Sequence, residues 1–138
     1  MQLYSAQNNS SISIDKGQSL INQLNIISQK NEIQVIIETG TYTGLGSTKL
    51  LAEIFSSSNF FEKLYSCEVN WVFYEHAKKN LKSFSKISCL YGLTVNYSEA
   101  LRFIKNDSVL SNHRNYPEIF IDNIQNPVDF YIKGTSIN

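Results

Sequence analysis

The segment from Val35 to Phe55, VIIETGTYTGLGSTKLLAEIF, constrains the fold more than any other part of this 138-residue chain. A β-branched apolar run comes first, a glycine-rich stretch follows, and apolar residues at helical spacing complete the segment. This order predicts a buried strand, a tight loop and an amphipathic helix. A loop of this kind, between a strand and the start of a helix, commonly binds the polar part of a nucleotide cofactor.

The rest of the chain continues this alternation of helix and strand. Strands are predicted at Gln34–Glu38, Lys63–Glu68, Lys86–Tyr91 and Glu118–Asp122, helices at Lys16–Lys30, Leu45 or Gly46 to Ser56, Trp71–Phe84 and Tyr97–Lys105, and a polar loop at Asn106–Tyr116. The spacing predicts right-handed βαβ units and an α/β fold, a Rossmann-like three-layer αβα sandwich with a mostly parallel sheet. Residues 1–14 are expected to form a polar lead-in, and residues 15–138 a single domain.

Composition narrows the class of function. The 12 basic and 12 acidic residues give a formal net charge of zero, so no overall field favours nucleic acid or an anionic membrane. The sequence has neither a signal-peptide pattern nor an apolar run of membrane-spanning length, and we expect a cytoplasmic protein. Cys67 and Cys89 are expected to be reduced core thiols. His76 and His113 lack partners at metal-ligand spacing, so no metal site is predicted.

Carboxylates end three of the four predicted strands, at Glu38, Glu68 and Asp122. Ligands of open α/β sheets bind beyond the carboxyl ends of the strands. Because an unpaired buried carboxylate is costly, three of them at one edge suggest a ligand rich in hydroxyl and cationic groups.

Two cofactors fit the letters of the glycine-rich loop. Thr-Gly-x-x-x-Gly-x-Gly, from Thr39 to Gly46, fits a nicotinamide dinucleotide, and Glu-x-Gly-x-x-x-Gly, from Glu38 to Gly44, fits S-adenosylmethionine. The dinucleotide carries a pyrophosphate, which the Glu38 carboxylate would repel. S-adenosylmethionine carries a sulfonium, an ammonium and two ribose hydroxyls. Glu38 would favour its cationic end, directly or by ordering the loop, and Glu68 would accept hydrogen bonds from the ribose.

Four motifs, in order, resemble those of class I S-adenosylmethionine-dependent methyltransferases, and among them the catechol O-methyltransferase-like and bacterial small-molecule O-methyltransferases. The first strand leads into Glu-x-Gly-x-Tyr-x-Gly, the second into an acidic residue and x-Asn, the third into Gly-x-Thr, and the fourth into an aliphatic residue and Asp. The matching residues are Glu38, Gly40, Tyr42, Gly44, Glu68, Asn70, Gly92, Thr94, Ile121 and Asp122.

The resemblance implies a role for each of these positions. Glu68 would hold the ribose, Val69 and Thr94 would border the adenine, and Asp122, the candidate catalytic residue, would lie close to the transferred methyl group. The methionine part of the cofactor would be surrounded by Glu38, Gly40, Tyr42, Gly44, Gly46 and Ser47. Mg²⁺, which some members of the family use, would find an incomplete set of ligands.

In that family the sheet continues beyond the fourth strand, whereas few residues follow Asp122 here. The chain is therefore expected to be a partial domain without the C-terminal strands of the methyltransferase fold. Its fourth strand would offer an open edge to a second copy or a partner chain. The predicted function is methyl transfer from S-adenosylmethionine to an oxygen of a small molecule, which leaves S-adenosylhomocysteine. Two alternatives remain: a non-catalytic S-adenosylmethionine-binding or interaction module completed by a partner, and a fragment of an NAD(P)-dependent dehydrogenase.

Overall fold

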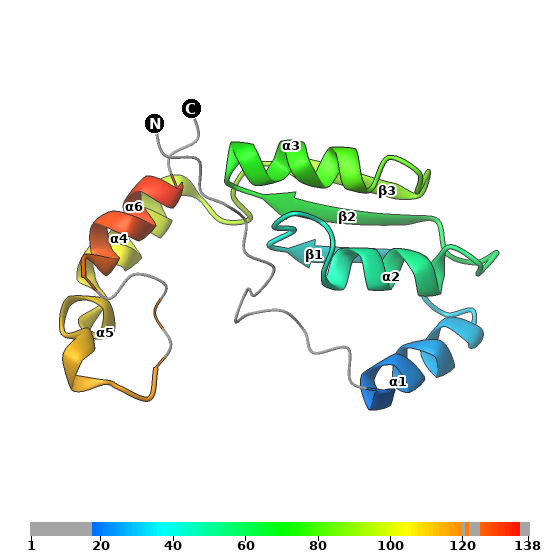
Figure 1. The fold of residues 1–138 in the computed structure, drawn as a ribbon, viewed down its shortest axis with the longest axis horizontal. Coiled ribbons are helices and arrows are strands. Elements are labelled where there is room, and N and C mark those ends of the chain that lie inside the picture. The colour runs from blue at the N-terminus through cyan, green and yellow to red at the C-terminus, as the bar shows by residue number, and fades with distance from the viewer. Residues whose placement is uncertain (1–17, 120, 122–124, 136–138) are drawn as a thin grey trace.

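The computed structural model describes residues 18–119, 121 and 125–135 (Figure 1). Along the chain the elements are α1 (Gln18–Gln29), β1 (Val35–Thr39), α2 (Ser47–Phe55), β2 (Lys63–Glu68), α3 (Trp71–Asn80), β3 (Ile87–Tyr91), α4 (Tyr97–Asn106), α5 (Ser108–Ser111), the 3-10 turn η1 (His113–Asn115) and α6 (Pro127–Thr135). Each helix and strand predicted between Lys16 and Lys105 has a counterpart within a few residues of its expected bounds.

The three strands form one parallel sheet in the order β1-β2-β3, and α2 and α3 make the crossovers that this arrangement requires. The predicted α/β fold with a parallel sheet is confirmed. In the register, Glu38 lies beside Ser66, and Ser66 lies beside Cys89, so these side chains project from the same face. All three strands end at the same edge of the sheet, on the left in Figure 1, and the loops that follow them meet there.

The hydrophobic core lies between one face of the sheet and helices α1 and α2. Phe55, Phe61 and Leu64 are buried at its centre, and the ring centroids of the two phenylalanines are 5.7 Å apart. Partly buried residues pack around this centre: Leu24, Ile27, Ile33, Ile36, Leu51, Ile54 and Ile87. Helix α3 covers the same face farther across the sheet, where its residue Ala77 is buried. Three helices therefore cover this face.

The opposite face of the sheet carries exposed apolar side chains. Val35 is 47% exposed, Ile37 74%, Tyr65 39% and Leu90 44%. Strands of parallel sheets are usually covered on both faces, and side chains of this kind are typical of a surface that another element covers. We call these four residues the open sheet face.

Helices α4, α5 and α6 pack on one another and lie beyond the carboxyl ends of the strands (Figure 1). The prediction of a polar loop at Asn106–Tyr116 is wrong where α5 and η1 form. There Asp107 starts the short helix α5 by accepting a hydrogen bond from the backbone N–H of Leu110 at 2.7 Å. Pro127 opens α6, a position where its fixed φ and missing N–H are tolerated.

The described residues of the predicted fourth strand, Glu118, Ile119 and Ile121, do not have strand geometry. The backbone N–H of Ile119 donates to the carbonyl of Tyr116 at 3.0 Å and closes a turn around Pro117. A proline that enters such a turn ends an extended run. Phe120 and Asp122 lie outside the described residues.

A substitution at Gly44 can test how tightly the loop after β1 packs against α3. Its φ of 76° suits glycine, and a Cβ atom there would come 2.8 Å from Leu81 Cδ1 and 3.2 Å from the Cα of Ala77. We expect Gly44→Ala to lower the free energy of unfolding by about 1–3 kcal/mol, measured by urea denaturation.

Gly134→Ala is the matched control, because it lies within α6 with open space around its Cβ position. It should leave stability unchanged or raise it by up to about 1 kcal/mol. Equal effects of the two substitutions would contradict the packing described for the loop.

Candidate cofactor site

The loop between β1 and α2 folds back over the end of β2. Gly40, Tyr42 and Gly44 have positive φ angles of 86°, 52° and 76°. The backbone N–H groups of Gly40 and Thr41 both donate to the carbonyl of Cys67, at 2.9 and 3.0 Å, and that of Gly44 donates to the carbonyl of Thr41 at 3.0 Å. These bonds fix a compact turn at the edge where the ligands of open α/β sheets bind.

The Glu38 carboxylate holds this loop and the start of α2 in place. It accepts hydrogen bonds from the hydroxyls of Ser47 at 2.5 Å, Thr48 at 2.6 Å and Ser66 at 2.6 Å. The Ser66 hydroxyl is also 2.5 Å from that of Thr41. Since the donors come from β2 and the first turn of α2, one side chain joins three elements. Of the two roles predicted for Glu38, ordering the loop is the one that this geometry supports.

Glu68 ends β2 and is only 7% exposed. Its Oε2 accepts a hydrogen bond from the backbone N–H of Tyr42 at 2.7 Å, and its Oε1 accepts one from the backbone N–H of Asn70 at 2.8 Å. An ionised carboxylate has about four acceptor positions, so two bonds orient the group and leave capacity for hydroxyl donors.

Helix α3 also contacts the loop that follows β1. The Asn70 side chain starts this helix by accepting hydrogen bonds from the N–H groups of Val72 and Phe73 at 2.9 and 3.2 Å. The ring of Tyr42 packs on Phe73 with centroids 4.3 Å apart, and Asn80 Nδ2 donates to the Thr43 carbonyl at 2.8 Å. The left-handed conformation of Tyr42 is thus stabilised both by its N–H bond to Glu68 and by its ring contact.

The remaining predicted residues lie along the same edge of the sheet, with differing exposure. Gly46 precedes α2 and provides no side-chain cap for its first turn, and Val69 is partly buried just after Glu68. Thr94 is exposed in the bend after β3, and the cap of α4 is Asn96. Asp122, the predicted catalytic residue, lies outside the described residues.

An aromatic cluster next to Glu68 was not assigned to the site from the sequence. The rings of Trp71, Tyr74 and Tyr91 contact one another with centroids 5.1–5.5 Å apart, and Tyr91 is the neighbour of Glu68 in the sheet register. Trp71 remains 53% exposed, and Lys78 Nζ lies 4.9 Å from the centroid of the Tyr74 ring. Trp71 and Tyr74 lie in the first turn of α3, and Tyr91 is the last residue of β3. Once parallel strands are assumed, these positions fall at the same edge of the sheet, so the contact could have been predicted.

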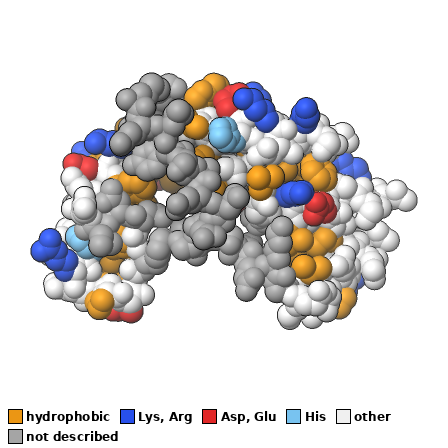
Figure 2. All heavy atoms as spheres, in the orientation of Figure 1, with side chains coloured by type: hydrophobic (Ala, Val, Ile, Leu, Met, Phe, Trp, Pro, Cys, Tyr) orange, Lys and Arg blue, Asp and Glu red, His pale blue; other side chains and the backbone are white. Residues whose placement is uncertain are grey.

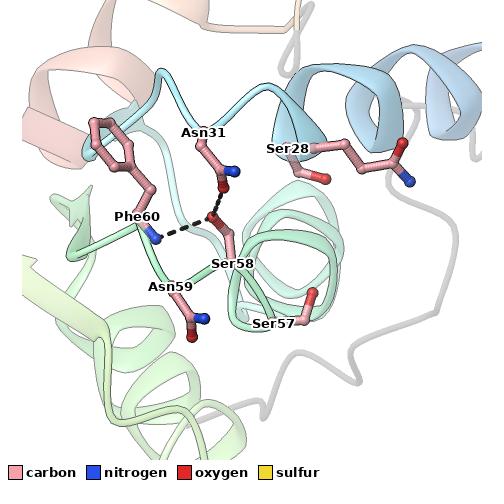
Figure 3. Close-up of a pocket in the computed structure, with 7 residues that line it drawn as sticks. Ser28, Asn31, Ser57, Ser58, Asn59 and Phe60 are labelled. Carbon is pink, nitrogen blue, oxygen red and sulfur yellow. Dashed lines mark hydrogen bonds between the residues drawn. The ribbon is translucent and has the colours of Figure 1, made fainter.

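A depression of the surface lies at the opposite end of the sheet (Figure 3). It has a volume of about 530 Å³ and is lined by hydroxyl and amide side chains and one ring: Ser28, Gln29, Asn31, Ser57, Ser58, Asn59 and Phe60. Ser58 Oγ donates to Asn31 Oδ1 at 3.3 Å. Because it lies at the amino ends of the strands, this depression is separate from the loop, Glu38 and Glu68.

The described residues add no metal-binding group to the site. On the face shown in Figure 2, basic and acidic side chains are scattered, and several lie next to one another. Among residues 18–119, 121 and 125–135, no group of His, Cys, Asp or Glu could hold a metal ion, so Mg²⁺ has no support there. None of the described helices is long and apolar enough to cross a membrane.

Cys89 faces the Glu38 network from β3. Burial raises the pKa of its thiol, and the nearby Glu38 carboxylate raises that pKa further, while Lys78 acts weakly in the opposite direction. Both main causes disfavour the thiolate, which is the reactive form of cysteine.

Comparisons with known proteins give distant structural neighbours. Neither a protein-family model nor a curated protein matches the sequence. A Staphylococcus aureus crystal structure, provisionally assigned as a caffeoyl-CoA O-methyltransferase, is 14% identical with a TM-score of 0.45, over 84% of this chain and 70% of that one. TrmK of M. capricolum, in complex with its natural cofactor product S-adenosylhomocysteine, is 22% identical with a TM-score of 0.39, over 66% and 36%. The methyltransferase domain of bacterial Hen1 is 22% identical with a TM-score of 0.42, over 61% and 44%.

This chain spans less than half the length of the TrmK and Hen1 structures. With identities below 25% and TM-scores below 0.5, these similarities carry no argument about function. Membership of the methyltransferase family therefore stays a prediction, and the function has to be argued from the geometry of the loop and its neighbours.

Glu38→Gln tests the network that holds the loop. A glutamine offers one acceptor oxygen and an NH₂ donor, so at least one of the three hydroxyls loses its acceptor. We expect the free energy of unfolding to fall by about 1–3 kcal/mol, measured by urea denaturation. Glu53→Gln is the control, because Glu53 is an exposed residue of α2 whose ion pair with Lys49 spans 3.5 Å. Its effect should stay within about 0.5 kcal/mol, and a similar loss in both variants would contradict the role given to Glu38.

Alkylation of Cys89 tests the polarity around it. In a Cys67→Ser variant, the rate of reaction with iodoacetamide should rise with pH through a midpoint above that of an ordinary cysteine, because the raised pKa keeps the thiol protonated. The same variant unfolded in urea provides the reference midpoint. Equal midpoints in the folded and unfolded states would show that neither burial nor Glu38 changes the pKa of the Cys89 thiol.

Proposed function

We propose that this chain binds S-adenosylmethionine at the carboxyl edge of β1, β2 and β3. The observation that carries this proposal is that the loop after β1 uses its amide groups internally. The N–H groups of Gly40 and Thr41 bond to Cys67, that of Tyr42 bonds to the Glu68 carboxylate, and that of Gly44 bonds to Thr41.

These bonds argue against a nicotinamide dinucleotide. Its pyrophosphate would need N–H groups of the loop in addition to those in the first turn of the helix. Here four N–H groups of the loop already have acceptors within the protein. The carboxylates of Glu38 and Glu68 at the same edge would also repel phosphate. A cofactor without phosphate, which carries cationic groups and ribose hydroxyls, suits this edge better.

The chain offers partners for the ribose, the methionine carboxylate and the cationic groups of S-adenosylmethionine. Glu68 is oriented by two backbone N–H groups and retains acceptor positions for the ribose hydroxyls. Gly46 leaves the first turn of α2 without a side-chain cap, so the amide groups of this turn suit the methionine carboxylate. The sulfonium and ammonium groups would lie in the negative potential of Glu38 and Glu68.

The proposed reaction is methyl transfer to an oxygen of a small molecule. When bound, S-adenosylmethionine supplies a methyl group that an acceptor oxygen takes by in-line displacement, with the C–S bonding pair passing to sulfur. The protein's part is to position the reactants and to manage charge. The motif resemblance assigns to Asp122 the place nearest the methyl group, where its carboxylate would accept the proton that the acceptor loses.

A second candidate function is a non-catalytic S-adenosylmethionine-binding module completed by a partner. The observation that favours it is the open sheet face, with Ile37 74% exposed, which a finished domain would be expected to cover. Both candidate functions require the same cofactor site, and only an activity measurement with acceptors separates them.

Calorimetric titration tests the site. We expect the full chain to bind S-adenosylmethionine and S-adenosylhomocysteine, and to bind NAD far more weakly. Glu68→Gln should weaken binding by roughly tenfold to a hundredfold, because it replaces a charged acceptor of ribose hydroxyls with a neutral one.

Glu62→Gln is the matched control, since Glu62 is an exposed carboxylate that precedes the amino end of the same strand. It should bind S-adenosylmethionine like the unmodified chain. Thermal unfolding of both variants shows whether they keep their fold. Tighter binding of NAD than of S-adenosylmethionine would overturn the proposal.

A further inference from the structure

The described chain consists of two bodies that contact each other little. The first contains α1, α2, α3 and the sheet, and the second, which we call the helical unit, contains α4, α5, η1 and α6. The extensive contacts between elements lie within one body or the other. Residues 92–96 connect the two bodies, and Figure 1 shows the helical unit standing beside the sheet edge.

The helical unit has too small a core to stand alone. Between residues 97 and 135, the described residues that are buried are Ile104, Ile121 and Pro127. Units of about 40 residues rarely bury enough apolar surface to be stable without a metal, disulfides or a partner. Meanwhile several of its apolar side chains are exposed: Tyr97 44%, Phe103 67% and Phe130 43%.

The sheet has an exposed apolar face that a helical unit could cover. The open sheet face presents Val35, Ile37, Tyr65 and Leu90 from all three strands. Lys63 is the charged residue that projects from this face within the strands, at the amino end of β2. An apolar surface of this kind on a parallel sheet is normally covered by helices. Among residues 18–119, 121 and 125–135, nothing covers this face of the sheet, and the helical unit has no extensive contact with the sheet.

We propose that two copies of this chain form a reciprocal dimer, in which the helical unit of each copy packs on the open sheet face of the other. The chain is electrically neutral, so no net repulsion opposes association of two copies. A two-fold arrangement covers both sheet faces and both helical units at once. This interface is a different surface from the strand-four edge predicted from the sequence, part of which lies outside the described residues.

The area available is sufficient for such a dimer. Three strands about 4.8 Å apart and five residues long make a face of roughly 250 Å² in plan. Two such faces, each covered by a helical unit, bury about 1,000 Å² in total, which is near the lower limit for a specific interface. A single contact between two sheet faces would bury about half of that. The reciprocal arrangement is thus favoured over direct stacking of the two sheets.

The test compares association of single variants with association of their mixture, measured by sedimentation velocity. The full chain should be a dimer. Ile37→Glu damages the sheet face and Phe103→Glu damages the helical unit, and each variant alone should be monomeric. Both side chains are largely exposed within one copy, so neither substitution should unfold the chain. Ile26→Glu, at an exposed position of α1, is the control and should remain dimeric.

The mixture of the two variants gives the decisive result. A mixed pair keeps one intact contact, between the sheet face of the Phe103→Glu chain and the helical unit of the Ile37→Glu chain. We expect the mixture to form a heterodimer at least about tenfold weaker than the unmodified dimer. A monomeric full chain would overturn the proposal. So would loss of the dimer in Ile37→Glu alone without recovery on mixing, which would indicate stacking of sheet on sheet. The outcome does not depend on cofactor binding.

Discussion

The hydrogen bonds of the Glu38 carboxylate are the interaction on which the rest of the candidate site depends. Its three hydroxyl donors come from the first turn of α2 and from β2, so one side chain fixes where the helix starts relative to two strands. A carboxylate at this depth would be costly without donors. Hydroxyls suit it because each adds a strong hydrogen bond without adding charge, and Glu38 therefore keeps its negative field at the edge of the sheet.

That field decides which ligands the edge can accept. The loop that Glu38 holds directs the N–H of Tyr42 to a second carboxylate, Glu68, so the backbone dipoles that could attract an anion neutralise part of a fixed negative charge instead. In a phosphate-binding loop the same N–H groups are left free for the ligand. Two loops can therefore share glycine spacing and differ in ligand class, and the difference lies in the partners of the amide groups.

The sequence was informative where structure is set locally. The runs VIIET and KLYSCE contain β-branched or aromatic residues and are bounded by loops. They form β1 and β2. The loop conformation followed from its glycines, and the position of Glu68 at a strand end followed from the alternation of helix and strand. These features depend on residues within about ten positions of one another, where pattern and propensity are strongest.

The parts that sequence reasoning missed depend on longer-range contacts or on single capping bonds. Ser66 lies 28 residues from Glu38, and nothing in its neighbourhood marks it as a hydrogen-bond donor to that carboxylate. Helix α5 depends on one bond from Asp107 to Leu110, which is hard to separate from the turn chemistry of a polar loop. The fourth strand was predicted from an apolar run, but the turn that begins at Tyr116 directs its described residues away from extended geometry.

The two bodies of the chain connect these observations to function. The carboxyl edge and the open sheet face belong to the same three strands. Polar bonds within the sheet body hold the loops at the edge, whereas nothing among the described residues covers the face. Binding at the edge is therefore separable from covering the face. The helical unit follows residues 92–96, so if it covered the face it would lie close to the carboxyl ends, where the proposed cofactor and its acceptor would meet. An acceptor pocket built in this way would depend on how the two bodies are joined, even though the hydrogen bonds that hold the cofactor loop would not.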